Sequence, residues 1–274
     1  MGIDRDPERS PKNIGVIGAG VMGEALIAAL ISSGIAASSI TVTEKRDERA
    51  AELMDKYQIN SAGLKENVEL ADALLLVVKP QDMQSTLMEI RNWITDATLV
   101  ISFAAGKRID FITAALGSQF PIIRVMPNTP TLVGEGMAAI SIGAGVSLTQ
   151  LNFVRDFLQA TGRVVEVNES LQDAVTAVSG SGPAYFFAFI EAMISAGVEL
   201  GLAADVATEL SVQTMVGAAK LLATSGDSAE SLREKVTSPN GTTAAALDSF
   251  SKSDLAGTVT KAMTAARDRS RELA

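Results

Sequence analysis

The chain has 274 residues, of which 47% are hydrophobic, and its formal net charge is −9. This charge argues against a general binder of nucleic acid or of an anionic membrane surface. The sequence holds neither cysteine nor histidine, which excludes disulfides, zinc–thiolate sites and the Ser-His-Asp and Cys-His mechanisms. Any proton transfer must therefore use a hydroxyl, a lysine, a carboxylate or the substrate itself.

The first part of the chain has the pattern of an α/β domain. Residues 1–12 are polar and are expected to form a loose tail. Residues 13–167 then alternate helix-like stretches with extended apolar runs, which are NIGVIG, SITVTE, ALLLVV, TLVISF, PIIRVM, GMAAISI and RVVEV. This alternation predicts a doubly wound parallel sheet.

Residues 168–274 contain almost only helical patterns. The expected helices span residues 171–177, 184–201, 204–225, 229–236, 243–250 and 255–273. They are rich in alanine and glycine as well as in larger apolar residues, so that helices can approach one another closely. We expect an all-helical domain that forms a buried homodimer interface; a helical cap within one chain is the alternative.

The most apolar helical stretch does not have the composition of a membrane span. Residues 184–202 are interrupted by Glu191 and Glu199, whereas a transmembrane helix needs roughly 20 residues with few charges. No stretch resembles a targeting signal. We therefore expect a soluble, cytoplasmic protein.

A glycine-rich loop follows the first strand and opens the first helix. Gly18, Gly20 and Gly23 form the pattern G-x-G-x-x-G in the strand–turn–helix context that dinucleotide binding requires. Gly18 permits the tight turn, Gly20 lets the backbone approach a pyrophosphate, and Gly23 lets helix and strand pack. This indicates a Rossmann-type domain; a glycine turn without a ligand is the alternative. The expected contacts are Gly18, Ala19, Gly20, Val21, Met22 and Gly23.

The end of the second strand, TVTEKR, bears on the choice of cofactor. Glu44 favours NAD, because its carboxylate suits the ribose hydroxyls of the adenosine. Lys45 and Arg46 favour NADP, because their charges suit a 2′-phosphate. The two signals conflict, and a solvated loop is the third interpretation.

Two further loops follow strands at the edge of the sheet where ligands bind. VVKPQD contributes the expected cofactor contacts Val77, Val78, Lys79 and Pro80. The alternative for Lys79 is a charge that simply ends a strand. FAAG contributes Phe103, Ala104 and Ala105. The second loop offers little but backbone, which suits the close approach of a nicotinamide.

Five motifs together resemble the pyrroline-5-carboxylate reductases in content and order. They are IGVIGAGVMGEAL, VVKPQD, RVMPNTP, DAVTAVSGSGPAYFF and VTSPNGTTAAAL. The resemblance spans residues 13–274, and the last two motifs are long and specific. It implies a Rossmann domain, a helical dimerisation domain whose dimers often assemble further, and reduction of 1-pyrroline-5-carboxylate to L-proline with NAD(P)H, the last step of proline biosynthesis.

The sequence departs from the family pattern at three places. Asn240 replaces a glycine of the usual SPGGTT, and asparagine tolerates left-handed backbone angles better than most residues. Leu64 stands where many members have an asparagine that contacts the adenosine, so this contact is not assigned. Glu44 and Lys45 replace an Asn-Arg-type pair of NADP-preferring members. We expect NADPH as cofactor, with NADH as the alternative.

The resemblance and the residues together indicate a substrate loop at TSPNGTT. The loop leads into a helix near Thr242, and free N–H groups at a helix start bind anions. The amides of Gly241, Thr242 and Thr243 with the Ser238 hydroxyl are expected to hold the substrate carboxylate. The Thr243 hydroxyl is expected to bond the ring nitrogen, which makes Thr243 and Ser238 the catalytic candidates; simple helix capping is the alternative.

The stretch VSGSGPAYFF is expected to form a turn at residues 179–181, followed by a helix with Pro183 in its first turn. By the resemblance this turn is a wall of the active site near the nicotinamide; a plain helix cap with core aromatics is the alternative. Two rival functions remain. A β-hydroxyacid dehydrogenase would carry a catalytic lysine on the helix after Ser181, where none occurs before Lys220. A dinucleotide-binding sensor would leave TSPNGTT unexplained.

Overall fold

The computed structural model describes residues 10–117 and 119–273. Within these ranges the chain forms two compact units. Unit 1 comprises residues up to Ser181 together with residues 266–273, and unit 2 comprises Gly182–Ala265. The compact boundary therefore lies 15 residues beyond Glu166, where the last described strand ends. The functional division between residues 167 and 168 stays a prediction.

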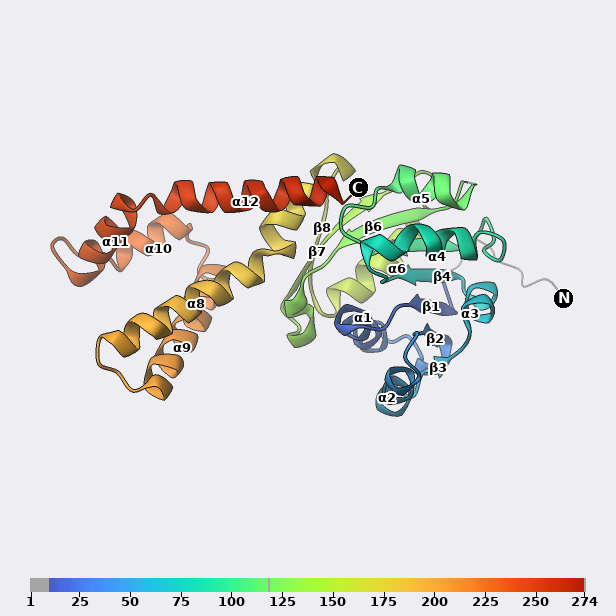
Figure 1. Ribbon diagram of the computed structural model, residues 1–274, viewed down its shortest axis with the longest axis horizontal. Helices are drawn as coiled ribbons and strands as arrows, with labels where there is room; N and C mark the ends of the chain where they lie inside the picture. The colour runs from blue at the N-terminus through green and yellow to red at the C-terminus, as the bar shows by residue number, and fades with distance from the viewer. Residues whose placement is uncertain (1–9, 118, 274) are drawn as a thin grey trace. The chain divides into compact units, whose positions relative to one another are not determined.

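Unit 1 is built on a sheet whose described strands follow the order β3-β2-β1-β4-β5-β6-β7-β8 (Figure 1). The strands are β1 Ile14–Ile17, β2 Ile40–Thr43, β3 Asn60–Ser61, β4 Ala73–Leu76, β5 Leu99–Ser102, β6 Ile122–Met126, β7 Gly136–Ile142 and β8 Gly162–Glu166. Neighbours pair in parallel except β6 and β7. The doubly wound parallel sheet is thus confirmed for most of its width.

The expectation of parallel pairing was wrong between β6 and β7. Only a short 3₁₀ segment, Thr129–Val133, separates these strands. A parallel pair needs a crossover of about a dozen residues or more, usually a helix, to return the chain to the starting edge. The short connection leaves antiparallel pairing, in which Ile123 faces Ile142 and Met126 faces Ala139.

Helices cover both faces of the sheet. They are α1 Val21–Ser32, α2 Asp47–Tyr57, α3 Leu64–Leu70, α4 Met83–Ile90, α5 Ile109–Leu116 and α6 Leu148–Gln159. One buried cluster joins side chains of α1, α2 and α6 to the sheet, and a second joins those of α3, α4 and α5. Leu75 of β4 belongs to the first cluster, whereas Leu74 and Leu76 belong to the second, so this central strand is buried on both faces.

Unit 2 contains helices and lacks a large core of its own. Its helices are α8 Gly182–Glu199, α9 Ala204–Thr224, α10 Ala229–Lys235, α11 Thr242–Lys252 and the first part of α12 Leu255–Glu272. Helices α8 and α9 pack against each other (Figure 1). Gly197 of α8 lies close to Ala207 of α9. In unit 2 the buried residues are Gly182, Ile190, Ala207 and Ser211. Most of its large apolar side chains are therefore exposed in the single chain.

Contrary to the expectation drawn from Glu191 and Glu199, the helical run Glu169–Glu199 is long and apolar enough to cross a membrane by length and composition alone. Of its most apolar window, 17% is buried.

This run includes the short helix α7 Gln172–Val175 and a π-helical segment, Thr176–Gly180, before α8 begins. The expected turn at residues 179–181 was therefore wrong for Ser179 and Gly180, which belong to the π-helical segment, and only Ser181 forms a bend before α8 begins at Gly182.

Candidate active site

The glycine loop lies where three strands end together. Gly18 has φ +91°, and a Cβ atom there would lie 2.8 Å from the carbonyl oxygen of Val77, which follows β4. The Gly18 amide donates to the Thr43 carbonyl at the end of β2, at 3.0 Å. Both the backbone angle and the close contact require glycine, because an L side chain rarely adopts this φ and would collide with Val77.

The remainder of the loop is open toward a ligand. A Cβ atom on Gly20 would meet no atom within 4 Å, whereas one on Gly23 would lie 2.4 Å from the Gly18 carbonyl oxygen. Helix α1 begins at Val21, and no side chain caps it. Its first amides are therefore available to an anion. Gly23 provides the close packing of helix on loop, and Gly20 leaves open space at the start of the helix.

The Glu44 side chain points to the glycine loop. Its Oε2 accepts a hydrogen bond from the Ala19 amide at 3.0 Å, and its Oε1 accepts from the Arg46 amide at 3.2 Å and from Arg46 Nε at 2.9 Å. Burial raises the pKa of the Glu44 carboxyl, but the hydrogen bonds from Arg46 and Ala19 outweigh it and lower this pKa overall. The carboxylate is therefore ionised at neutral pH.

Arg49 of α2 holds the same loop from its carbonyl side. Its Nε donates to the Ala19 carbonyl at 3.1 Å, and its guanidinium is paired with Glu24 of α1. Glu24 also accepts from Lys56 Nζ at 2.8 Å and from the Tyr57 hydroxyl at 3.1 Å. Hydrogen bonds from Lys56 and Arg49 lower the pKa of Glu24 to about 2. Sequence reasoning missed Arg49, because nothing in a helix pattern indicates that an arginine bonds a loop 30 residues earlier.

The two other cofactor segments follow β4 and β5. Val77, Val78 and Pro80 are half-buried, and Lys79 is exposed without an ion pair to any described residue. Phe103 and Ala104 are buried and Ala105 is half-buried, with the Phe103 amide bonded to the Leu76 carbonyl at 3.0 Å. These segments lie at the carboxyl ends of neighbouring strands, the edge at which doubly wound sheets bind ligands.

The end of α12 packs on the turn after β5. Gly106 has φ +75°, and a Cβ atom there would lie 2.8 Å from both the Leu273 Cβ and the Ser270 carbonyl oxygen. The Ser270 hydroxyl in turn donates to Asp173 at 2.7 Å. The FAAG turn is therefore fixed by the last turn of the chain's final helix, a contact that no local pattern predicts.

Asn128, from RVMPNTP, joins three segments of unit 1. Its side-chain nitrogen donates to the Ser179 carbonyl at 3.1 Å, and its oxygen accepts from the Met137 amide at 2.8 Å. This connects the loop after β6, the start of β7 and the π-helical segment that contains Ser179. π-Helical turns are rare and occur frequently at functional sites.

The substrate loop, residues 237–243, has the geometry of an uncapped helix start. Asn240 has φ +57°, which confirms that asparagine accommodates the left-handed position. The Gly241 amide donates to the Ser238 carbonyl at 3.0 Å, and α11 then begins at Thr242 without a side-chain cap. Ser238 and Thr242 are exposed and Thr243 is half-buried. Among the described residues, none forms a hydrogen bond with the side-chain hydroxyls of Ser238, Thr242 and Thr243.

The structure thus groups the predicted residues into two sets. The cofactor set (Gly18, Ala19, Gly20, Val21, Met22, Gly23, Glu44, Lys45, Val77, Val78, Lys79, Pro80, Phe103, Ala104 and Ala105) lies in unit 1. The substrate set (Ser238, Gly241, Thr242 and Thr243) lies in unit 2. The described residues hold no group of three or more acidic side chains suited to a metal ion.

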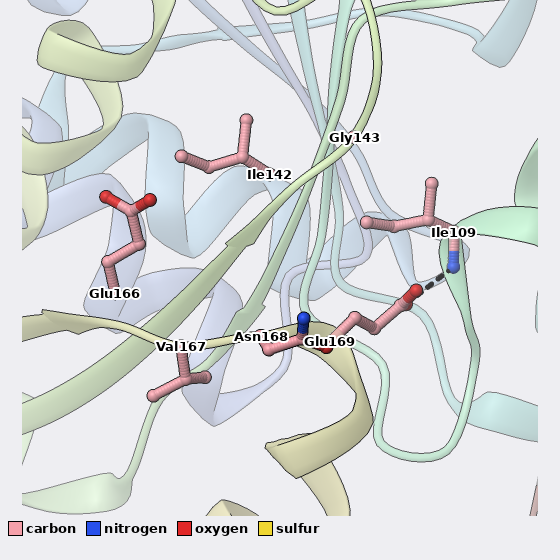
Figure 2. Close-up of a pocket in the computed structure, with 7 residues that line it drawn as sticks. All are labelled: Ile109, Ile142, Gly143, Glu166, Val167, Asn168 and Glu169. Carbon is pink, nitrogen blue, oxygen red and sulfur yellow. Dashed lines mark hydrogen bonds between the residues drawn. The ribbon is translucent and has the colours of Figure 1, made fainter.

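A separate hollow of about 600 Å³ contains none of these residues. Figure 2 shows its lining, which is Ile109, Ile142, Gly143, Glu166, Val167, Asn168 and Glu169. Glu169 accepts from the Ile109 amide at 2.7 Å and pairs with the buried Arg124 at 3.3 Å. Because Ile142 pairs with Ile123 near the start of β6, this hollow is not at the carboxyl end of that strand.

Two family models match the chain. One, described as pyrroline-5-carboxylate reductase dimerisation, matches residues 169–273. The other, described as NADP oxidoreductase coenzyme F420-dependent, matches residues 13–106. Together they cover most of both units.

Whole-length relatives are similar over nearly the complete chain. A pyrroline-5-carboxylate reductase of Corynebacterium melassecola is 42% identical over 95% of this chain and 98% of its own. The pyrroline-5-carboxylate reductase of Pseudomonas aeruginosa is 39% identical over 97% of this chain and 98% of its own. A solved pyrroline-5-carboxylate reductase from Coxiella burnetii superposes with a TM-score of 0.89, at 33% identity over 96% of this chain and 98% of its own. A Plasmodium falciparum pyrroline carboxylate reductase with NADP bound superposes with a TM-score of 0.85, at 31% identity over 95% of this chain and 97% of its own.

More distant structures share the fold alone. A 3-hydroxyisobutyrate dehydrogenase from Salmonella typhimurium is 18% identical, with a TM-score of 0.52 over 71% of this chain and 70% of its own. The chain belongs to the pyrroline-5-carboxylate reductase family.

Proposed function

We propose that the chain catalyses hydride transfer from NAD(P)H to the C=N carbon of 1-pyrroline-5-carboxylate and so forms L-proline, the last step of proline biosynthesis. The observation that carries this proposal is the 42% identity to a pyrroline-5-carboxylate reductase over 95% of the chain. That span includes both the glycine loop, proposed to bind the cofactor, and the substrate loop, proposed to bind the imine.

Unit 1 has the features that a dinucleotide requires. The open space at Gly20 and the uncapped start of α1 fit a pyrophosphate. Backbone after β4 and β5, with Phe103, Ala104 and Ala105, fits the nicotinamide end. When bound, NAD(P)H supplies the hydride. We propose NADPH as the cofactor and NADH as the alternative, since one structural relative has NADP bound.

Unit 2 offers groups for a small cyclic imine that carries a carboxylate. The amides of Gly241, Thr242 and Thr243 at the start of α11, with the Ser238 hydroxyl, would hold the carboxylate. The Thr243 hydroxyl would hydrogen-bond the ring nitrogen as it gains electron density. Because the chain has no histidine, a hydroxyl relay or an iminium that binds already protonated supplies the proton. Most of the acceleration then comes from orientation.

We propose that the functional form is a homodimer, which can assemble further. The exposed apolar side chains of unit 2 include Phe186, Phe187, Leu210 and Val216. A second copy of the same helices would present the same apolar side chains and so would bury these residues against apolar surface. The family model for dimerisation spans residues 169–273 and includes the apolar run Glu169–Glu199. A cytoplasmic location remains part of the proposal.

The proposal is tested by incubating the purified protein with racemic pyrroline-5-carboxylate and either reduced cofactor. We expect loss of absorbance at the nicotinamide band together with stoichiometric proline. The β-hydroxyacid dehydrogenase alternative predicts turnover of a hydroxyacid with the oxidised cofactor instead. The sensor alternative predicts binding of the cofactor without consumption.

A further inference from the structure

The Glu44 carboxylate is held in one place at the adenosine end of the glycine loop. It directly follows β2, and its Oε2 accepts from the Ala19 amide at 3.0 Å. Its Oε1 accepts both the amide and Nε of Arg46 at 3.2 and 2.9 Å. The side chain is only 9% exposed. With three donors on two oxygens, the carboxylate has little freedom to turn away from a cofactor bound at this loop.

Arg46 and Lys45 are not equivalent beside this carboxylate. Arg46 is paired with Glu44, so that its charge is largely offset where it stands. Lys45 is exposed and makes no ion pair with the described part of the chain. A phosphate on the adenosine ribose would therefore meet one fixed anion and one uncompensated cation, Lys45.

A carboxylate after the second strand of a dinucleotide-binding domain accepts hydrogen bonds from the ribose hydroxyls of NAD and repels the 2′-phosphate of NADP. We infer that Glu44 is a specificity-determining residue that keeps NADH usable by this chain, while Lys45 is the residue that admits NADPH. This inference rests on the proposed function only for the identity of the cofactor pair. It explains how the two opposed signals in TVTEKR coexist, since one side chain addresses each cofactor.

The test measures dissociation constants of NADPH and NADH by nicotinamide fluorescence, without substrate. Glu44→Gln keeps the shape of the side chain and an oxygen for the Ala19 amide but removes the charge. We expect the ratio of the NADH to the NADPH dissociation constant to rise by about 10- to 100-fold, through tighter NADPH and weaker NADH binding. Glu66→Gln, an exposed carboxylate in the first turn of α3, is the matched control and should leave the ratio unchanged.

A second variant works in the opposite direction and leaves Glu44 in place. Lys45→Gln should weaken NADPH by about 10-fold or more and NADH by less than about 3-fold. Arg46→Gln should weaken NADPH less than Lys45→Gln does. An unchanged ratio in Glu44→Gln, or weaker binding of both cofactors to the same extent, would overturn the inference and make Glu44 a support of the loop. A parent protein that binds both cofactors but reduces no pyrroline-5-carboxylate would instead overturn the proposed function alone.

Discussion

A Cβ atom on Gly23 would lie 2.4 Å from the carbonyl oxygen of Gly18. No rotation of a side chain relieves this contact, because both partners are backbone or the first side-chain atom. We expect Gly23→Ala to lower the free energy of unfolding by about 1–3 kcal/mol, as overpacking does. Urea denaturation of the parent and the variant measures this loss. Equal stability would show that α1 shifts on the sheet at no cost.

Gly20→Ala is the matched opposite case. Its Cβ atom would enter open space, and Gly20 already has φ −65°, which alanine adopts freely. We expect the stability of the cofactor-free protein to change by less than about 1 kcal/mol. The added methyl group would occupy the approach of the pyrophosphate, so the dissociation constant of NADPH should rise about 10-fold or more. Unchanged cofactor affinity in a folded Gly20→Ala protein would remove the pyrophosphate from this loop.

The Glu24 cluster should appear in the pH dependence of stability. Its folded pKa is about 2 against an ordinary 4.5, so the folded state favours the ionised form. The contribution is therefore complete above about pH 4.5 and is lost as the pH falls toward 2. We expect Glu24→Gln to cost about 1–2 kcal/mol at pH 7, since Lys56 is exposed and screened by solvent, and to cost little near pH 2. Glu89→Gln, on the exposed side of α4, is the control; a cost for Glu24→Gln that is independent of pH would contradict the assignment.

The alternation of strands and helices could be predicted from the sequence, because each central strand is a short apolar run and each helix has apolar residues at helical spacing. All seven expected strands occur, from Ile14 to Glu166. The short β3 and α3 were not predicted, since Asn60 and Ser61 are exposed and polar and carry no strand pattern. The antiparallel pairing of β7 with β6 follows from the short connection between these two strands. The apolar patterns that predict strands do not show how the strands pair.

The candidate site was predictable in its motifs and not in its contacts. The roles of Gly18, Gly20 and Gly23 follow from local geometry, and the structure gives each of them the expected surroundings. The direction of Glu44 was open, because a residue at a strand end can point to solvent or to the neighbouring loop. The contacts of Arg49 with Ala19 and of Asn128 with Ser179 join segments distant in sequence, and only the folded chain brings them together.

Thr243→Val separates shape from hydrogen bonding in the substrate loop. It keeps the branched side chain and removes the hydroxyl, which bonds no described residue. If this hydroxyl stabilises the nitrogen of the imine as it is reduced, kcat/KM for pyrroline-5-carboxylate should fall by about 10- to 1000-fold. Thr243→Ser should retain most of the activity, and NADPH affinity should barely change. Thr260→Val, an exposed threonine of α12, is the control; full activity of Thr243→Val would favour an iminium protonated in solution.

The exposed apolar face of unit 2 gives a prediction for assembly. Leu210 of α9 is 54% exposed, and Met88 of α4 in unit 1 is 51% exposed. We expect the parent to sediment as a dimer or a larger closed oligomer at micromolar concentration. Leu210→Glu should raise the dissociation constant of the dimer by about 10-fold or more, because it buries a charge at the proposed interface, whereas Met88→Glu should not. A parent that is a folded monomer would reject the dimer.

Hydride transfer to the C=N carbon is tested by following the hydride itself. The protein is incubated with pyrroline-5-carboxylate and NADPH that carries two deuterium atoms at C4 of the nicotinamide, and the proline formed is analysed by mass spectrometry and NMR. We predict one deuterium per proline, on the ring carbon bonded to nitrogen that does not carry the carboxylate, with one oxidised cofactor formed for each proline. Proline without deuterium, deuterium at another carbon, or no proline from either cofactor would contradict hydride transfer to the C=N carbon.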